Sequence, residues 1–277
     1  MRRNFAQILR EAEIDIKFEY RTLYELFYKE DIHLGFGQFV SIRDAIDKDF
    51  LHIWFRGTCI SLDDFDKKFG YNFVSQPQEF DIEYLVSFCE YLYNFSLAYR
   101  CAEPSMTSHS AIEYVNFLMN QIEKVIELIG YMHAKEDGLV IFVEKSSAAI
   151  AVSEVLPNEE AYKVISYNHY SMRGNIEEKR SILVQLAMSL EGKRGQLKSI
   201  NKDLESDIFF LFNNINIRHN NCDESSMKYK KHVADMDAET MEKWYDRTYQ
   251  MCLTAFLELE RLDEKEELNQ LKLGIGK

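Results

Sequence analysis

Residues 81–99 read DIEYLVSFCEYLYNFSLAY, and they carry the clearest signal of the fold class. Apolar residues recur along it at intervals of three and four, which places them on one stripe of an α-helix. The members of this stripe are Ile82, Leu85, Phe88, Leu92, Phe95 and Tyr99. Pro104 then marks a turn, and a second stripe runs from Val115 to Met132. The pattern predicts an antiparallel helical hairpin over residues 81–136.

Helical patterns also lie on both sides of this hairpin. The first thirty residues predict a helix with a face rich in Tyr and Phe, and Ser61 and Gly70 have the residue types that begin and end a short helix. The stretch between Phe50 and Leu62 is compatible with a short strand. Farther along, a Leu/Ile stripe that keeps its register across Gly192 and Gly195 predicts one long helix over 183–215, straight or kinked at these glycines. A last helix is expected from about Asp237 until it reaches a charged tail.

The hydrophobic pattern changes between residues 139 and 170. Here the short apolar runs LVIFV, AAIAV and YKVISY are separated by polar residues. These runs predict a small β hairpin or a three-stranded insert. The fold class is therefore mainly α, an antiparallel helical bundle with this insert. We expect an aromatic-rich helical region over 1–137, a β-containing connector over 138–172 and a C-terminal helical region over 173–277.

Composition limits the classes of function. The chain has 277 residues and a formal net charge of −13, so contact with nucleic acid needs a local basic region. Its five cysteines form no CxxC pair, which favours reduced thiols and a cytoplasmic location. No apolar run reaches the length of a membrane span, and the N-terminus lacks the apolar core of a signal peptide. Aromatic residues make up 13% of the chain and are expected to fill space between helices.

One polar segment stands out, Asn213–Asn221, with the sequence NNINIRHNN. From Asn213 to His232 the formal charge is +2, and the stretch Arg173–Lys202 carries seven Lys and Arg against three Glu. These two stretches make a face that is expected to attract phosphate groups. The residues predicted to hold a nucleic-acid backbone are Lys193, Arg194, Lys228, Lys230 and Lys231.

Within the polar segment, Arg218 and His219 are the candidate catalytic residues. An imidazole moves protons near neutral pH, and a guanidinium offsets charge that develops on a phosphate. Asn216 and Asn220 are predicted to orient these groups. The alternative interpretation is structural, because asparagines at a helix C-terminus take left-handed cap conformations and basic residues there favour the helix dipole.

The region from about Tyr167 to Leu262 resembles the HEPN-type helical domains of bacterial abortive-infection and toxin proteins. Two long helices flank a polar junction in which an arginine is followed by a polar residue, here IRHNN. The resemblance implies a metal-independent RNase that acts as a homodimer, with Arg218 and His219 in its site. The histidine that such domains carry four to six residues after the arginine is absent, since Cys222, Asp223 and Glu224 stand there.

The leading prediction is thus a phage-defence or toxin-type RNase with RNA as partner and no cofactor. The alternative is a non-enzymatic interaction or sensor protein, in which the aromatic N-terminal half binds a protein and the junction is a polar network. A third hypothesis is a metal enzyme, because two pairs of ligand-type residues are spaced by one helical turn. These pairs are His109 with Glu113 and His133 with Asp137. The sequence has no HExxH motif, and no metal is predicted.

Overall fold

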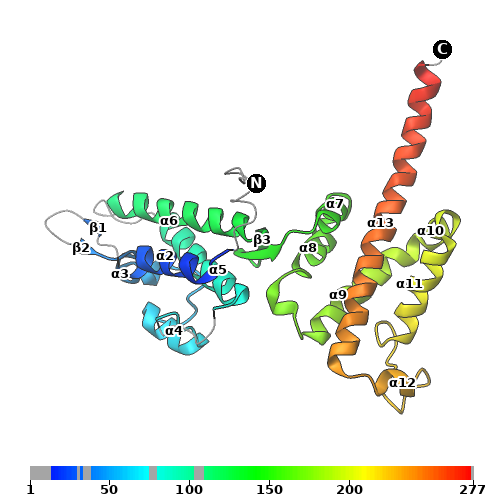
Figure 1. Ribbon diagram of the computed structural model, residues 1–277, viewed down its shortest axis with the longest axis horizontal. Coiled ribbons are helices and arrows are strands. Elements are labelled where there is room, and N and C mark those ends of the chain that lie inside the picture. Colours follow the sequence, from blue (N-terminus) through cyan, green and yellow to red (C-terminus); the bar gives the residue numbers. More distant parts are fainter. Residues whose placement is uncertain (1–13, 30–31, 34–38, 75–79, 103–108, 276–277) are drawn as a thin grey trace, which may run out of the picture. The chain divides into compact units, whose positions relative to one another are not determined.

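The computed structural model describes residues 14–29, 32–33, 39–74, 80–102 and 109–275. Helices dominate these ranges, which confirms the mainly α prediction (Figure 1). The chain divides into two compact units, residues 1–142 and 143–277. None of the helices in the described ranges combines the length and the hydropathy needed to cross a membrane.

The first unit is built from helices and one small sheet. Its helices are α2 (Ile16–Tyr28), α3 (Ile42–Lys48), α4 (Leu62–Phe69), α5 (Ile82–Cys101) and α6 (His109–Leu128). Strands β1 (Ile32–His33) and β2 (Phe39–Val40) pair in antiparallel fashion, with Ile32 opposite Val40. Residues 50–52 form a 3₁₀ turn in place of the expected strand.

The local signals for α4 and α5 are confirmed. Ser61 Oγ accepts the backbone N–H of Asp64 at 3.1 Å, and Gly70 ends α4 in a left-handed conformation with φ of 76°. Along α5, Leu85, Phe88 and Leu92 are fully buried, as their common stripe predicts. The first thirty residues are described only from residue 14, so the earlier part of that prediction lies outside the described residues.

Aromatic side chains fill the core of the first unit, as expected from their number. Tyr20 on α2 is fully buried, and its ring centroid lies 4.7 Å from that of Phe88 on α5. The Tyr20 hydroxyl donates to the carbonyl of Phe73. Phe65 on α4 and Phe95 on α5 meet edge to face, with centroids 5.1 Å apart. Each ring therefore bridges two helices, which suits a large rigid side chain.

A β hairpin follows α6, but it starts earlier than predicted. Strands β3 (Tyr131–Glu136) and β4 (Leu139–Glu144) are joined by Asp137 and Gly138, whose φ angles of 48° and 85° suit a two-residue hairpin turn. The helix predicted to reach Met132 ends at Leu128, because Gly130 turns the chain with φ of 80°. On β4, Val140 exchanges two hydrogen bonds with the Asn94 side chain of α5, at 2.8 and 2.7 Å.

The other two runs assigned to the β insert are helical. AAIAV lies in α7 (Ser147–Val155) and most of YKVISY lies in α8 (Asn158–Ser166). Ser146 caps α7 by accepting the N–H of Ala149 at 3.3 Å, and Pro157 precedes the first residue of α8. Short apolar runs fit a buried helix as well as a strand, and the cap decides between them here.

The predicted long helix over 183–215 is wrong, because three helices cover it. They are α9 (Ile176–Gly192), α10 (Arg194–Ile200) and α11 (Lys202–Asn214). Lys193 ends α9, and Asn201 caps α11 by accepting the N–H of Leu204 at 3.0 Å. Each helix turns its own part of the Leu/Ile stripe toward one core, so the stripe survives the breaks.

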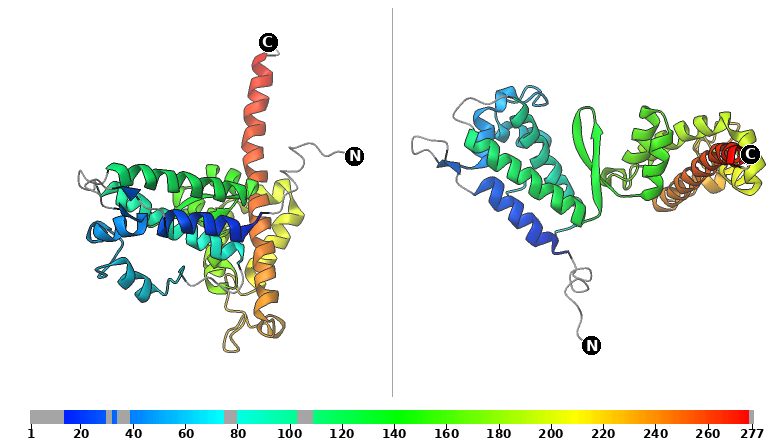
Figure 2. Two further views of the ribbon diagram at one scale, coloured as in Figure 1. Left: turned by 60° about the vertical axis from the view of Figure 1, so that its left-hand side comes forward. Right: turned by 90° about the horizontal axis from the view of Figure 1, so that it is seen from above.

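The last helices of the second unit are α12 (Lys231–Ala234) and α13 (Ala238–Ile275). Helix α13 packs against α7, α9, α10 and α11 with a face that includes Tyr245, Cys252 and Leu259. The charged tail predicted after this helix is itself helical as far as Ile275. In Figures 1 and 2 this end of α13 continues beyond the other helices of its unit.

Candidate functional site

The polar segment Asn213–Asn221 begins in the last turn of α11 and continues into a closed turn. The N–H of Asn216 donates to Asn221 Oδ1 at 2.8 Å, and the N–H of Asn221 donates to Asn216 Oδ1 at 3.0 Å. Asn216 has φ of 61°, a left-handed conformation that asparagine tolerates better than most residues. The two asparagines thus clip the ends of the turn together.

Asn221 is the centre of the segment. It is completely buried, and its Nδ2 donates to the carbonyls of Lys228 at 2.7 Å and Asn213 at 3.3 Å. Its own carbonyl accepts the N–H of Lys230 at 2.8 Å. The sequence prediction missed Asn221, because it is one of five asparagines in nine residues and nothing local distinguishes it.

Two residues from distant helices also reach the turn. Arg180 on α9 donates through Nε to the carbonyl of Asn216, and the Tyr245 hydroxyl on α13 lies 3.4 Å from the same oxygen. Burial raises the pKa of Tyr245 to about 12. The turn is therefore anchored to both helices that pack beside it, which supports a structural role for Asn216.

The two predicted arginines pair with carboxylates. The Arg218 guanidinium donates to Glu191 on α9. Arg194 donates through Nε to Glu205 Oε1 at 2.6 Å, and its guanidinium carbon lies 4.2 Å from the ring centroid of Phe209. These carboxylates offset the charge that each arginine would offer to a phosphate.

His219 and Asn220 lie on the outside of the turn. The His219 ring is partly exposed and has no hydrogen bond or ion pair within the described ranges. The Asn220 side chain donates to Asp223 at 3.3 Å, and that of Asn216 bonds to Asn221. The two asparagines predicted to orient His219 are thus engaged elsewhere. The structure places the four predicted residues in one turn without aligning their functional groups.

The predicted lysines lie at the surface. Lys228, Lys230 and Lys231 follow the turn, and all three side chains are exposed and have no ion pair within the described residues. Lys193, between α9 and α10, is exposed in the same way. The backbone near these lysines is nonetheless held, because Asn221 bonds to the main chain at Lys228 and Lys230. We call residues 216–231 the basic loop.

The structure does not support a metal site built from the pairs His109 with Glu113 and His133 with Asp137. Asp137 is in the hairpin turn and His133 is in β3, so they are not one helical turn apart. The His133 ring packs edge to face against Tyr93 and Phe142, with centroids 5.2 and 5.1 Å away. The side chain of His109 lies outside the described residues. Across the residues that the structure describes, no three or more His, Cys, Asp or Glu side chains gather as metal ligands.

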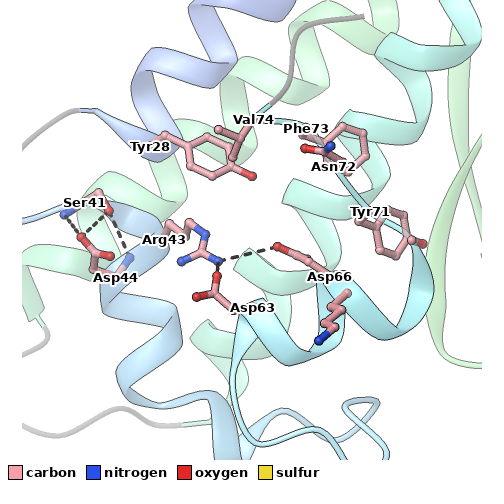
Figure 3. A pocket seen from close by; sticks show the side chains of 12 residues that line it. Tyr28, Ser41, Arg43, Asp44, Asp63, Asp66, Tyr71, Asn72, Phe73 and Val74 are labelled. Carbon is pink, nitrogen blue, oxygen red and sulfur yellow. Dashed lines mark hydrogen bonds and ion pairs between the residues drawn. The ribbon is translucent and has the colours of Figure 1, made fainter.

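A pocket of about 660 Å³ in the first unit was not anticipated (Figure 3). Arg43 on α3 lies at its centre and pairs with Asp63 and, at 3.6 Å, with Asp66, both on α4. The Tyr91 hydroxyl donates to Asp66 at 2.7 Å. Burial raises the pKa of Asp66 despite these partners. Tyr28 lies beside Arg43 in Figure 3 and also lines the pocket.

This pocket favours a structural role for Arg43. Two carboxylates already share its guanidinium, so an incoming anion would have to displace Asp63 or Asp66. The cluster joins α3 to α4 across 20 residues of sequence, a separation that no local pattern reveals. Of the two carboxylates, Asp63 is largely exposed and is the one that water or a ligand reaches first.

A second charged cluster lies in the C-terminal unit. The buried ammonium of Lys179 on α9 donates to Glu242 at 2.6 Å and to Asp246 at 2.7 Å, both on α13. The Tyr167 hydroxyl donates to Asp246 at 2.9 Å. Burial tends to raise the pKa of Glu242, but hydrogen bonds from Lys179 and Gly174 lower it overall. A buried lysine needs such partners, and the cluster ties α9 to α13.

Comparisons of the chain with protein-family models, with curated proteins and with solved structures find no match. The likeness of residues 167–262 to HEPN-type domains therefore stays a prediction from the sequence.

Proposed function

We propose that this protein is a non-enzymatic interaction protein, in which the polar junction is a structural network that presents the basic loop to RNA. The observation that supports this most directly is the bonding of Asn221. Its side-chain oxygen and both of its amide hydrogens are occupied inside the protein, so it has none left for a substrate. A buried polar network whose donors and acceptors all have hydrogen-bond partners makes the backbone around it rigid, here the turn after α11.

In this proposal, the exposed lysines of the basic loop bind the phosphates of the RNA. Lys228, Lys230 and Lys231 lie within four positions of one another and are not neutralised by an ion pair among the described residues. Lysine ammonium groups bind backbone phosphates without reading sequence. Because the whole chain carries a net charge of −13, binding would be confined to this loop and would weaken steeply with salt.

Binding of a fluorescently labelled single-stranded RNA, followed by anisotropy over a salt series, tests this role. The triple variant Lys228→Ala/Lys230→Ala/Lys231→Ala should reduce the salt slope by about two to three, close to one for each lysine that contacts a phosphate. A matched control removes three exposed lysines of equal total charge, Lys124, Lys135 and Lys145. Absence of binding at low salt, or an equal loss in the control, contradicts the proposal.

A nuclease remains the second candidate, and one observation favours it. The His219 ring is partly exposed and Arg218 directly precedes it in the chain, so one turn holds a group that can transfer a proton and a cation that can offset charge on a phosphate. Against it, Arg218 pairs with Glu191 and neither Asn216 nor Asn220 orients the ring. Gel analysis of the same RNA separates the two functions. Intact RNA in the presence of bound protein supports the interaction protein, and cleavage that His219→Ala abolishes supports the nuclease.

A further inference from the structure

The projecting end of α13 carries an apolar stripe that its own unit does not cover. Leu268, Leu271 and Ile275 are 46%, 58% and 76% exposed. At about 100° per residue, Leu257 falls on the same stripe, whereas the buried Ala255 and Leu259 lie on the opposite side of the helix. In Figures 1 and 2 the backbone of this helix end extends past the other helices of the unit, in agreement with the exposure of these side chains.

The spacing of the stripe is that of a coiled coil. Leu268, Leu271 and Ile275 are three and four residues apart, which corresponds to the a, d and a positions of a heptad. One heptad earlier the same positions hold Arg261 and Glu264, so the apolar contact is limited to the last turns of the helix. Leu273 falls at position f, on the outer side of such a pair.

The charges beside the stripe are complementary to those of a second copy. Glu260 and Glu267 occupy g positions, and Lys265 and Lys272 occupy e positions. In a parallel pair each g residue faces the e residue five positions later on the partner helix, which joins Glu260 to Lys265 and Glu267 to Lys272. An antiparallel pair would bring g to g and e to e, and so join like charges. None of the four has an ion pair within the described residues.

We infer that residues 260–275 of two copies of this chain form a short parallel coiled coil. The apolar residues of each helix pack against the same residues of the other, and the flanking glutamates and lysines set the parallel direction. Because Arg261 and Glu264 interrupt the seam, the pairing is weak and depends on protein concentration. This surface is separate from the basic loop, so dimerisation and RNA contact fail or succeed independently.

Sedimentation equilibrium of the full chain over a range of concentrations tests the inference. Wild type should pass from monomer to dimer as concentration rises, whereas Leu268→Glu/Leu271→Glu should stay monomeric with an unchanged circular dichroism spectrum. Leu273→Glu is the matched control, because Leu273 is 64% exposed on the same helix end and should leave the dimer intact. A wild-type protein that is monomeric at every concentration overturns the inference, and so does equal dimerisation of the double variant.

Charge substitutions test the parallel direction. Glu267→Lys or Lys272→Glu alone should raise the dimer dissociation constant about fivefold, because each breaks two symmetry-related pairs of modest strength. The double variant Glu267→Lys/Lys272→Glu restores opposite charges in a parallel pair and should regain the wild-type constant. Only a parallel pair has g-to-e contacts that the double variant can restore, so a double variant that binds no more tightly than the single variants, or equal constants throughout, would exclude the parallel arrangement.

Discussion

Asn216 and Asn221 hold each other through two reciprocal hydrogen bonds, in which each backbone N–H donates to the side-chain oxygen of the other residue. The pair closes the turn that follows α11, and Asn221 alone continues the network to Asn213 and Lys228. In the sequence this segment is a cluster of similar polar residues, and in the structure one of them, Asn221, organises it.

Replacing Asn221 by alanine should destabilise the C-terminal unit by about 2–4 kcal/mol, because a buried N–H and two buried carbonyls lose their partner. Urea unfolding followed by circular dichroism measures the change. Asn220→Ala provides the comparison, since Asn220 is exposed and makes one long bond to Asp223, so a shift of about 0.5 kcal/mol or less is expected. Similar losses in both variants would contradict the central role of Asn221.

Substitutions at Asn216 separate its backbone conformation from its side-chain bond. Asn216→Gly keeps the left-handed conformation and loses only the bond to the Asn221 N–H, at a cost of about 1 kcal/mol. Asn216→Ala loses the same bond and also strains the backbone, for a total of about 2 kcal/mol. Thermal unfolding of both proteins should rank alanine below glycine. The reverse order would mean that the turn opens when the bond is lost.

Glu242 predicts a dependence of stability on pH. Its pKa in the folded protein lies below the ordinary value of 4.5, so the ionised form favours the folded state. Wild type should be more stable than Glu242→Gln at neutral pH, and the difference should shrink as the pH falls below about 4.5 through the lowered pKa. Unfolding free energies measured from pH 7 to pH 3 give this difference. Glu239→Gln, which removes a carboxylate at an exposed position on the same helix, is the control substitution.

The β3–β4 turn predicts a specific intolerance at Gly138. A Cβ atom there would lie 3.2 Å from Cη2 of Trp54, and φ of 85° is unfavourable for any residue with a side chain. Gly138→Ala should therefore destabilise the N-terminal unit by about 1–2 kcal/mol. Gly192→Ala at the end of α9 meets no atom within 4 Å and should be neutral or stabilising. Equal melting temperatures for the two variants would refute the role assigned to Gly138.

Much of the helical fold was predictable from local patterns. The stripe over residues 81–99 and the caps at Ser61 and Gly70 depend on neighbours within a few positions, and all three predictions are confirmed. The wrong predictions concern stretches whose local pattern is compatible with two different structures. The run AAIAV is apolar without a clear period, and the stripe over 183–215 continues across breaks at Lys193 and Asn201. A periodic pattern records which side is buried, not whether the chain continues straight.

Local sequence patterns were enough to predict that this protein is mainly helical and that its most polar segment lies at a helix end. The partners of the buried and charged side chains follow from the tertiary structure: Asn221 in the polar segment is buried, Arg218 in the same segment meets Glu191, and Lys179 on α9 is held by Glu242 and Asp246. These contacts join residues 27, 63 and 67 positions apart. Helical periodicity arises from neighbours along the chain, whereas a side chain's partner depends on which helices pack together.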